Sequence, residues 1–415
     1  MSAPAAIDQA LLAALRAETV GEPAGNVTVA RGTLDGRAVH VARVESRFAS
    51  GSIGHAEAER LTALFRVAGL QRSPLVLCLD SAGAKVSEGL GALGAFRFLF
   101  RAGLEAALAG APIAAVLGRN CFGGASMLAH LARSRLFSPG TRLAMSGPAV
   151  IAAGSGMDPL DEMFRAMAES AMSPAARASM NPANQVWEAG ADLTPWLRTA
   201  LAPGGDAAAE FHARHAALAK RFTAPIAAPT WEKVQRRDLE RIYAAGYEAR
   251  EFQGLLEGNG EGSQGREAFI GLTGDRPLAA ERAWRLADAV WNAVGAHVPV
   301  LRVFLDCATH ATRLEEEKLI LTEYVVDMST ALAVAAKRGA AVELTVLGKA
   351  GGGVYVALAA PARRVTSVYG AADIQVLPGS AVAAILGANH EALPSFDDCR
   401  AARVADEELK LGLVP

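Results

Sequence analysis

Short, mainly apolar runs recur at corresponding places in the two halves of this chain. They fill residues 74–79 and 112–117 in the first half, and residues 299–305 and 342–347 in the second. Runs of this length, bounded by proline, glycine and polar residues, are typical of strands buried on both faces of a parallel sheet. A helix-prone segment follows each run. The pattern therefore predicts strand-turn-helix units in both halves.

The later strand of each half leads into a glycine-rich turn. Residues 119–126 read RNCFGGAS, and residues 349–355 read KAGGGVY. Adjacent glycines between a strand and a small-residue helix let bare backbone N–H groups point at a developing anion. We interpret these turns as two oxyanion holes, although close packing of helix on strand is an alternative for either one.

The earlier strand of each half ends in an acidic residue and a polar turn. Asp80 is followed by SAGAKVSEG, and Asp306 is followed by CATHATR. Two strand-turn-helix units per half, in the same order, predict two homologous α/β domains. The candidate catalytic backbone groups are those of Gly83, Ala84, Gly123, Gly124, Gly352 and Gly353.

Side-chain candidates lie beside these turns. His310 follows a strand end and is a candidate proton donor, with a solvated loop histidine as the alternative. Lys85 and Lys349 abut the turns and are candidates for substrate binding, or else form surface ion pairs. Further substrate-binding candidates are Ser81 and Tyr355.

Composition narrows the function classes. The chain has 415 residues, which suits two domains of roughly 200 residues, and its formal net charge of −2 gives no basis for nucleic-acid binding. The first residues lack a signal-peptide pattern, and no apolar run reaches the roughly 20 residues needed to span a bilayer, so we expect a cytoplasmic protein without membrane contact.

The four cysteines predict neither a metal site nor a catalytic thiol. Cys78, Cys121, Cys307 and Cys399 are isolated from one another, and they lack the spacing of zinc ligands. Cys121 adjoins a glycine turn, but no paired base is visible, so a small buried thiol is favoured over a nucleophile.

The middle of the chain separates the halves. Residues 158–179 and 231–250 are predicted to be helical, the latter as a charged helix. Residues 254–265 have the most linker-like composition, with a long loop inside the second domain as the alternative. The boundary is placed near Ala228, which gives domains 1–228 and 229–415.

These motifs together resemble the carboxyltransferase branch of the crotonase superfamily. Residues 51–54, 80–88 and 123–124 resemble its β-type pattern, and residues 143–151 fit the segment that closes that domain. The γ-type pattern resembles residues 271–274, 306–317 and 348–353. The likeness is strongest to the β and γ subunits of biotin-independent malonate decarboxylase, joined here in one chain. It implies two tandem crotonase-like (carboxyltransferase-type) β-β-α superhelix domains, β type at 1–228 and γ type at 229–415.

The resemblance also implies a reaction and partners. It implies decarboxylation of a malonyl thioester to an acetyl thioester and CO₂, with the enolate held by backbone oxyanion holes. It further implies that no cofactor is bound permanently, that the substrate sits on the phosphopantetheine-type, CoA-derived arm of an acyl-carrier protein, and that a carrier transferase subunit is a further partner. The resemblance also implies that His310 could donate the proton or hold the thioester, and that Lys85 and Lys349 could bind the leaving carboxylate or the carrier phosphates. A homodimer or larger assembly is expected.

Two alternatives use the same architecture. One is an acyl-CoA carboxyltransferase that works with a biotin carrier, and the other is a non-catalytic homologue that binds a carrier protein. The chain also departs from the family pattern, since Lys85 and Ser87 replace an arginine and a glutamine. Backbone donors are unaffected, whereas a lysine cannot reproduce the two-pronged contacts of arginine.

Overall fold

The computed structural model describes residues 3–157, 161–262, 265–377 and 394–412. Internal contacts divide the chain into two compact units, of which the first comprises residues 1–85, 98–210 and 312–323. The second comprises residues 86–97, 211–311 and 324–415. Each unit therefore includes a short segment from the other half of the sequence. The boundary expected near residue 228 falls inside the segment 211–311 of the second unit.

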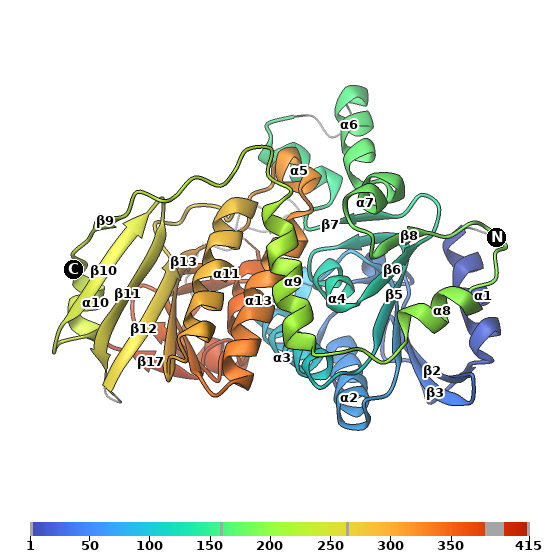
Figure 1. Ribbon diagram of the computed structural model, residues 1–415, viewed down its shortest axis with the longest axis horizontal. Coiled ribbons are helices and arrows are strands. Elements are labelled where there is room, and N and C mark those ends of the chain that lie inside the picture. Colours follow the sequence, from blue (N-terminus) through green and yellow to red (C-terminus); the bar gives the residue numbers. More distant parts are fainter. Residues whose placement is uncertain (1–2, 158–160, 263–264, 378–393, 413–415) are drawn as a thin grey trace. The chain divides into compact units, whose positions relative to one another are not determined.

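The first half combines strands and helices (Figure 1). In chain order they are α1 (Ala3–Leu15), β1 (Glu18–Thr19), β2 (Val27–Leu34), β3 (Arg37–Val44), α2 (His55–Gln71), β4 (Leu75–Ser81), α3 (Gly89–Leu108), β5 (Ile113–Phe122), α4 (Gly124–Leu131), β6 (Ser134–Phe137), β7 (Arg142–Ala144), α5 (Pro148–Gly154), α6 (Glu162–Met172), α7 (Pro174–Met180), β8 (Asn184–Val186) and α8 (Thr194–Ala200). Short 3₁₀ turns occupy Ala49–Gly51 and Val86–Glu88.

The second half also combines strands and helices. Its elements are α9 (Ala207–Ala219), β9 (Glu232–Lys233), α10 (Arg237–Ile242), β10 (Tyr247–Phe252), β11 (Leu255–Gly262), β12 (Gly265–Leu272), α11 (Ala280–Gly295), β13 (Val300–Cys307), α12 (Leu314–Lys318), α13 (Leu321–Lys337), β14 (Ala341–Gly351), α14 (Gly352–Ala359), β15 (Arg364–Val368), β16 (Asp373–Gln375), α16 (Phe396–Ala401) and β17 (Glu407–Leu409).

One mixed sheet forms the centre of the first unit. Its described strands follow the order β1-β2-β3-β4-β5-β6-β8, and β7 pairs with the end of β5. Strands β3 to β6 and β8 are parallel, whereas β1 and β2 are antiparallel additions. Helices α1 and α8 cover one face, where Leu11 and Leu197 pack with Val76 and Val116 (Figure 1).

The sheet of the second unit has the same central order. Its described strands run β17-β15-β14-β13-β12-β11-β10-β9, with β16 paired to β14. Strand β5 followed by α4 and strand β14 followed by α14 occupy corresponding positions in the two sheets. The prediction of two tandem α/β domains is therefore confirmed.

Two sequence predictions for the second unit are wrong. Residues 231–250 do not form one charged helix, because only Arg237–Ile242 is helical and Tyr247–Phe252 is strand β10. The described part of residues 254–265 is not a linker, because Leu255–Gly262 is strand β11, paired on both sides. A β-carbon on Gly258 would lie 2.4 Å from the Phe269 ring, and a β-carbon on Gly260 would lie 2.5 Å from the Tyr243 ring. These glycines make room for aromatic rings to pack on the strand. Composition alone does not distinguish this role from that of glycines in a flexible linker.

Within the described residues, no helix combines the length and the apolarity that crossing a membrane would require.

The first prediction concerns Gly118, in the middle of β5. A β-carbon there would lie 2.6 Å from Cβ of Asp80, so the Gly118→Ala variant is expected to lose about 1 to 3 kcal/mol of unfolding free energy. Gly91 in α3 is the matched control, because a β-carbon there meets nothing within 4 Å. Urea titrations should show Gly91→Ala to be as stable as the wild type or slightly more stable. Equal stability of the two variants would contradict the packing of Asp80 against Gly118.

The second prediction concerns His215, which joins α9 to the helices of the second unit. Its Nδ1 lies 2.7 Å from Asp327 Oδ2 and its Nε2 lies 3.4 Å from Asp288 Oδ1. Burial alone would lower the pKa of His215, but the hydrogen bonds to Asp288 and Asp327 raise it from 6.5 to about 9.

Because the folded-state pKa lies above the unfolded value, the charged histidine stabilises the protein fully below pH 6.5 and loses this effect as the pH rises towards 9. The difference in unfolding free energy between wild type and His215→Gln should therefore shrink over that range. Urea titrations at several pH values measure it, with the surface variant His55→Gln as control. A difference that is constant with pH would contradict the assignment.

Candidate active site

An aspartate sits inside a bulge at the end of the strand pair β4 and β5. Leu79 pairs with Leu117, but Ser81 pairs with Cys121, so β5 has extra residues at this point. Asp80 Oδ1 accepts the backbone N–H of Asn120 at 3.0 Å. Because Gly118 has no side chain, the carboxylate fits inside the bulge. Asp80 thereby fixes the path of β5 into the glycine turn.

The second unit repeats this arrangement. Between β13 and β14, Leu305 pairs with Val346 and Cys307 pairs with Ala350. Asp306 Oδ1 accepts the N–H of Lys349 at 3.0 Å, and its Oδ2 accepts the N–H of Gly274 at 3.1 Å. A β-carbon on Gly348 would lie 2.3 Å from Asp306 Oδ1. In each unit, therefore, the glycine turn follows a strand bulge that is filled by an aspartate side chain.

Helix α4 begins directly after the first glycine turn. Gly123 has φ of 54°, a conformation that residues with a side chain rarely adopt, and its N–H donates to Met145 O at 3.1 Å. Gly124 is the first residue of α4, and the first N–H groups of a helix have no partner within it. The turn therefore presents backbone donors at the positive end of the helix.

The polar turn after Asp80 lies against this helix start. A β-carbon on Gly83 would lie 2.9 Å from Phe122 O and 3.3 Å from Gly124 N. The sequence motifs at residues 80–88 and 123–124 are thus brought together. The N–H of Gly83 donates to the buried Ser81 Oγ at 3.1 Å, which directs it into the turn.

Ala84 is better placed than Gly83 to offer a donor. Ile53 donates to Gly83 O at 2.8 Å and accepts from Lys85 N at 3.0 Å, so the N–H of Ala84 faces away from Ile53. This pairing also explains the motif at residues 51–54, which wraps the turn. Lys85 follows directly and is half-buried.

The corresponding turns of the second unit also meet. A β-carbon on Gly351 would lie 2.5 Å from Ala308 O, so the turn after Asp306 contacts the start of α14. Gly352 has φ of 50° and begins the helix, followed by Gly353. Both helix starts contain one glycine with positive φ, which is the residue before α4 in the first unit and the first residue of α14 in the second.

The side-chain candidates of the second unit differ in exposure. His310 is buried, and burial lowers its pKa to about 4, so it is neutral at pH 7. Lys349 is exposed, and its Nζ lies 2.7 Å from Asp275 Oδ2, an ion pair that raises its pKa. The buried Tyr355 hydroxyl donates to Val404 O at 2.5 Å. Tyr355 therefore points into the core of the unit.

Cys121 is fully buried, and burial raises its pKa well above the ordinary value for a thiol. It is therefore protonated at neutral pH and forms part of the core, as the sequence analysis favoured.

Among the residues that the structure describes, no group of three His, Cys, Asp or Glu side chains could hold a metal ion.

Sequence reasoning missed the residues that support the first glycine turn from the other half of the chain. Segment 312–323 belongs to the first unit. Its Glu317 is fully buried, accepts the N–H of Ser146 at 2.9 Å and lies 3.4 Å from Arg177 Nη2. Breaking such a buried pair typically costs about 3 to 5 kcal/mol. No local signal could have identified these partners, because they lie far apart in the sequence.

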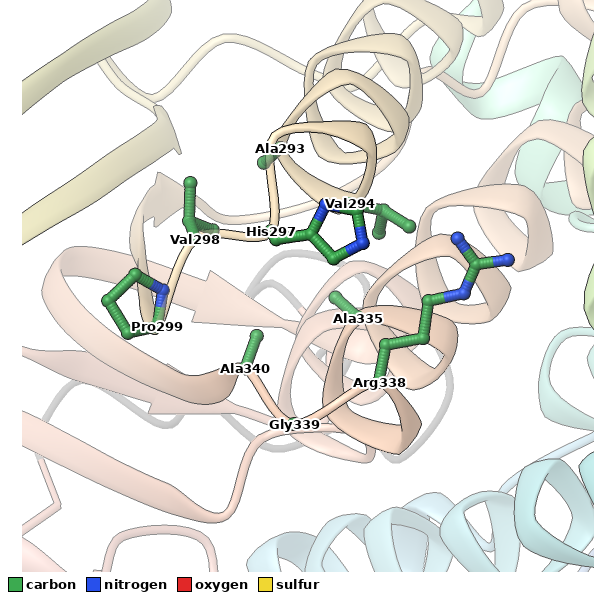
Figure 2. A pocket seen from close by; sticks show the side chains of 9 residues that line it. All are labelled: Ala293, Val294, His297, Val298, Pro299, Ala335, Arg338, Gly339 and Ala340. Atoms are coloured by element: carbon green, nitrogen blue, oxygen red, sulfur yellow. The ribbon is translucent and has the colours of Figure 1, made fainter.

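A small hollow of about 90 Å³ lies elsewhere in the second unit. Figure 2 shows His297 and Arg338 beside it, next to Pro299 and Ala340. These residues precede β13 and β14, whereas the glycine turns follow the strands. The hollow is thus at the opposite edge of the sheet. Arg338 follows the end of α13, where a positive side chain complements the helix dipole.

The family model of the carboxyl transferase domain matches residues 7–167. Among curated proteins, the chain is similar to the methylmalonyl-CoA carboxyltransferase 12S subunit of Propionibacterium freudenreichii subsp. shermanii. The two are 31% identical over 153 residues, which are 36% of this chain and 29% of that protein. The chain is also 28% identical over 153 residues to the methylmalonyl-CoA decarboxylase subunit alpha of Veillonella parvula, which are 36% of this chain and 30% of that protein.

These curated relatives are matched over less than a third of their own length, at 29% and 30%. Among solved structures, a Pseudomonas malonate decarboxylase hetero-tetramer in complex with malonate aligns with 53% of this chain and 91% of its own chain, at 20% identity and a TM-score of 0.44. The family match includes Asp80, Gly83 and the Gly123–Gly124 turn. Residues 7–167 of this chain are thus similar to a carboxyl transferase domain.

Proposed function

We propose that this chain decarboxylates a malonyl thioester, giving an acetyl thioester and CO₂ through an enolate. The proposal rests on one observation above all: the first helix start, with Gly124 at its head, is held in place by Asp80 and lies against the turn at Gly83. The carboxyl transferase match supports a substrate that carries a carboxylate next to a thioester. In this proposal the chain unites a β-type and a γ-type domain.

The reaction requires little more than a stabilised oxygen. The bond between C2 and the carboxylate carbon breaks, its electron pair forms the C1–C2 double bond, and negative charge moves to the thioester oxygen. CO₂ leaves, and a proton then adds to C2. Backbone N–H groups aimed at the thioester oxygen stabilise this charge, and each is typically worth about 100-fold to 1,000-fold in rate.

We assign the first-domain donors to Gly124 and Ala84. The N–H of Gly83 is directed to Ser81, and the N–H of Gly123 is directed to Met145, so these two glycines shape the turn. In the second domain we assign the donors to Gly352 and Gly353, of which Gly353 is the counterpart of Gly124.

The side chains take secondary roles in this proposal. His310 is a neutral imidazole at pH 7, so in this proposal it relays a proton, taking one up from solvent at one ring nitrogen as it gives one up at the other. Lys349 can meet a carboxylate or phosphate only by sharing its ion pair with Asp275. Lys85 is the corresponding candidate in the first domain.

The proposed assembly is a homodimer or larger, with the substrate on an acyl-carrier protein loaded by a carrier transferase subunit.

Carboxyl transfer between a biotin carrier and an acyl-CoA is the second candidate. It uses the same enolate, which attacks a carboxyl donor in place of accepting a proton. The similarity of residues 7–167 to carboxyltransferases favours it. The two reactions differ in whether biotin is needed.

The third prediction tests the turns. Replacing Gly124 with valine places a branched side chain at the helix start, so kcat/KM for a malonyl thioester should fall by about 100-fold or more. Gly353→Val makes the matched change in the second domain and shows whether the reaction needs that turn. Both variants should melt as cooperatively as the wild type. Wild-type turnover in a folded Gly124→Val protein would remove the first turn from the mechanism.

The fourth prediction separates the two reactions. Purified protein given malonyl-carrier protein, without biotin, ATP or added metal, should release CO₂ and leave acetyl-carrier protein, since only backbone donors and a proton are needed. Mass spectrometry of the carrier and trapping of CO₂ measure the products. CO₂ release or transfer that appears only with biotin would establish the carboxyltransferase instead, and no reaction with any malonyl or methylmalonyl thioester would exclude both.

A further inference from the structure

The first turn of α4 contains a buried hydroxyl that the proposed mechanism does not use. Ser126 is fully buried, and its Oγ lies 2.7 Å from Gly123 O. The same Oγ lies 3.1 Å from Oγ1 of Thr322, which is also fully buried. A serine at the N-cap accepts an N–H of the first turn, whereas a serine inside the helix can donate to a carbonyl three or four residues earlier, as Ser126 does to Gly123.

That carbonyl belongs to the peptide whose N–H is the proposed oxyanion donor. Gly123 O accepts from Ser126 Oγ and also from Met127 N at 3.1 Å. A trans peptide is planar, with its C=O and N–H pointing in opposite directions. Two donors that hold the carbonyl towards the helix therefore hold the N–H of Gly124 away from it, where an anion would bind.

A glycine pair needs this second hydrogen bond more than other residues do. Neither Gly123 nor Gly124 has a β-carbon to restrict its backbone, so the peptide between them rotates at low cost. The bond from Met127 N fixes one direction of the carbonyl, and the bond from Ser126 adds a second. Orientation of the donor before substrate arrives is what makes such groups effective.

The direction of the hydrogen bonds follows from proton count. The single Ser126 proton is given to Gly123 O, so the Thr322 hydroxyl donates to Ser126 Oγ. A hydroxyl that accepts one hydrogen bond becomes a better donor in the next. Thr322 lies in segment 312–323, which Glu317 and Arg177 anchor in the first unit. The second half of the sequence thus contributes to the first glycine turn.

We propose that Ser126 is a positioning residue that orients the Gly124 N–H for the enolate, with Thr322 supporting its hydroxyl. This inference rests on the proposed function and adds a side chain that acts without touching the substrate.

The test compares Ser126→Ala with Ser138→Ala. Ser138 is equally buried in the same unit, where its Oγ lies 3.0 Å from Thr141 Oγ1 and does not bind the Gly123 carbonyl. Ser126→Ala should lower kcat for a malonyl thioester by about tenfold and leave KM within about twofold, because the lost orientation affects charge that develops only in the transition state. Ser126→Thr restores the hydroxyl and should recover most of kcat, while Ser138→Ala should behave as wild type.

Amide hydrogen exchange at Met127 is a readout that does not depend on turnover. In Ser126→Ala the Gly123 carbonyl is free to swing away, so the Met127 amide should exchange at least about fivefold faster, with no change in Ser138→Ala. Wild-type kcat in Ser126→Ala, an effect on KM alone, or unchanged Met127 exchange would overturn the proposal. If the wild-type protein turns over no malonyl or methylmalonyl thioester, the proposed function fails, while Met127 exchange still decides whether Ser126 holds the turn.

Discussion

The geometry of both glycine turns depends on one interaction, a carboxylate that accepts a backbone N–H inside a strand bulge. Asp80 binds the N–H of Asn120, and Asp306 binds that of Lys349, each at 3.0 Å. A carboxylate bound to a backbone N–H makes a stronger hydrogen bond than a neutral acceptor, so the extra residues of the bulge are held in one path. The helix that follows therefore starts at a defined place in each unit.

The exchanged segments stabilise the two units in similar ways. In the first unit, Glu317 of segment 312–323 is buried against Arg177. In the second unit, Arg97 of segment 86–97 lies 2.8 Å from Asp406 Oδ2 and donates to Arg403 O at 3.0 Å. A buried charge without its partner is strongly destabilising, so each ion pair favours one position of its segment within the unit. Each half of the sequence thus depends on residues of the other half to complete its fold.

Burial also decides which groups near the turns can carry charge. His310 is neutral at pH 7 and Cys121 is a protonated thiol, because both are removed from water. The charged candidates Lys85 and Lys349 lie nearer the surface. In the proposed reaction the developing negative charge is therefore met chiefly by backbone dipoles, which are permanently oriented and need no titratable group.

Local pattern by itself determined the buried strands, the two glycine turns and the acidic strand ends, because periodicity and glycine placement are properties of neighbouring residues. It failed at strand β11, where Gly258 and Gly260 are required by rings from Phe269 and Tyr243. It also could not rank Gly83 against Ala84, since that choice depends on a hydrogen bond to Ser81 and a pairing with Ile53. The bond from Ser126 to Gly123 O is local, within the first turn of α4, whereas the contact with Thr322 was decided by the tertiary structure alone. Thr322 is distant in sequence, and only folding brings its hydroxyl within reach of Ser126.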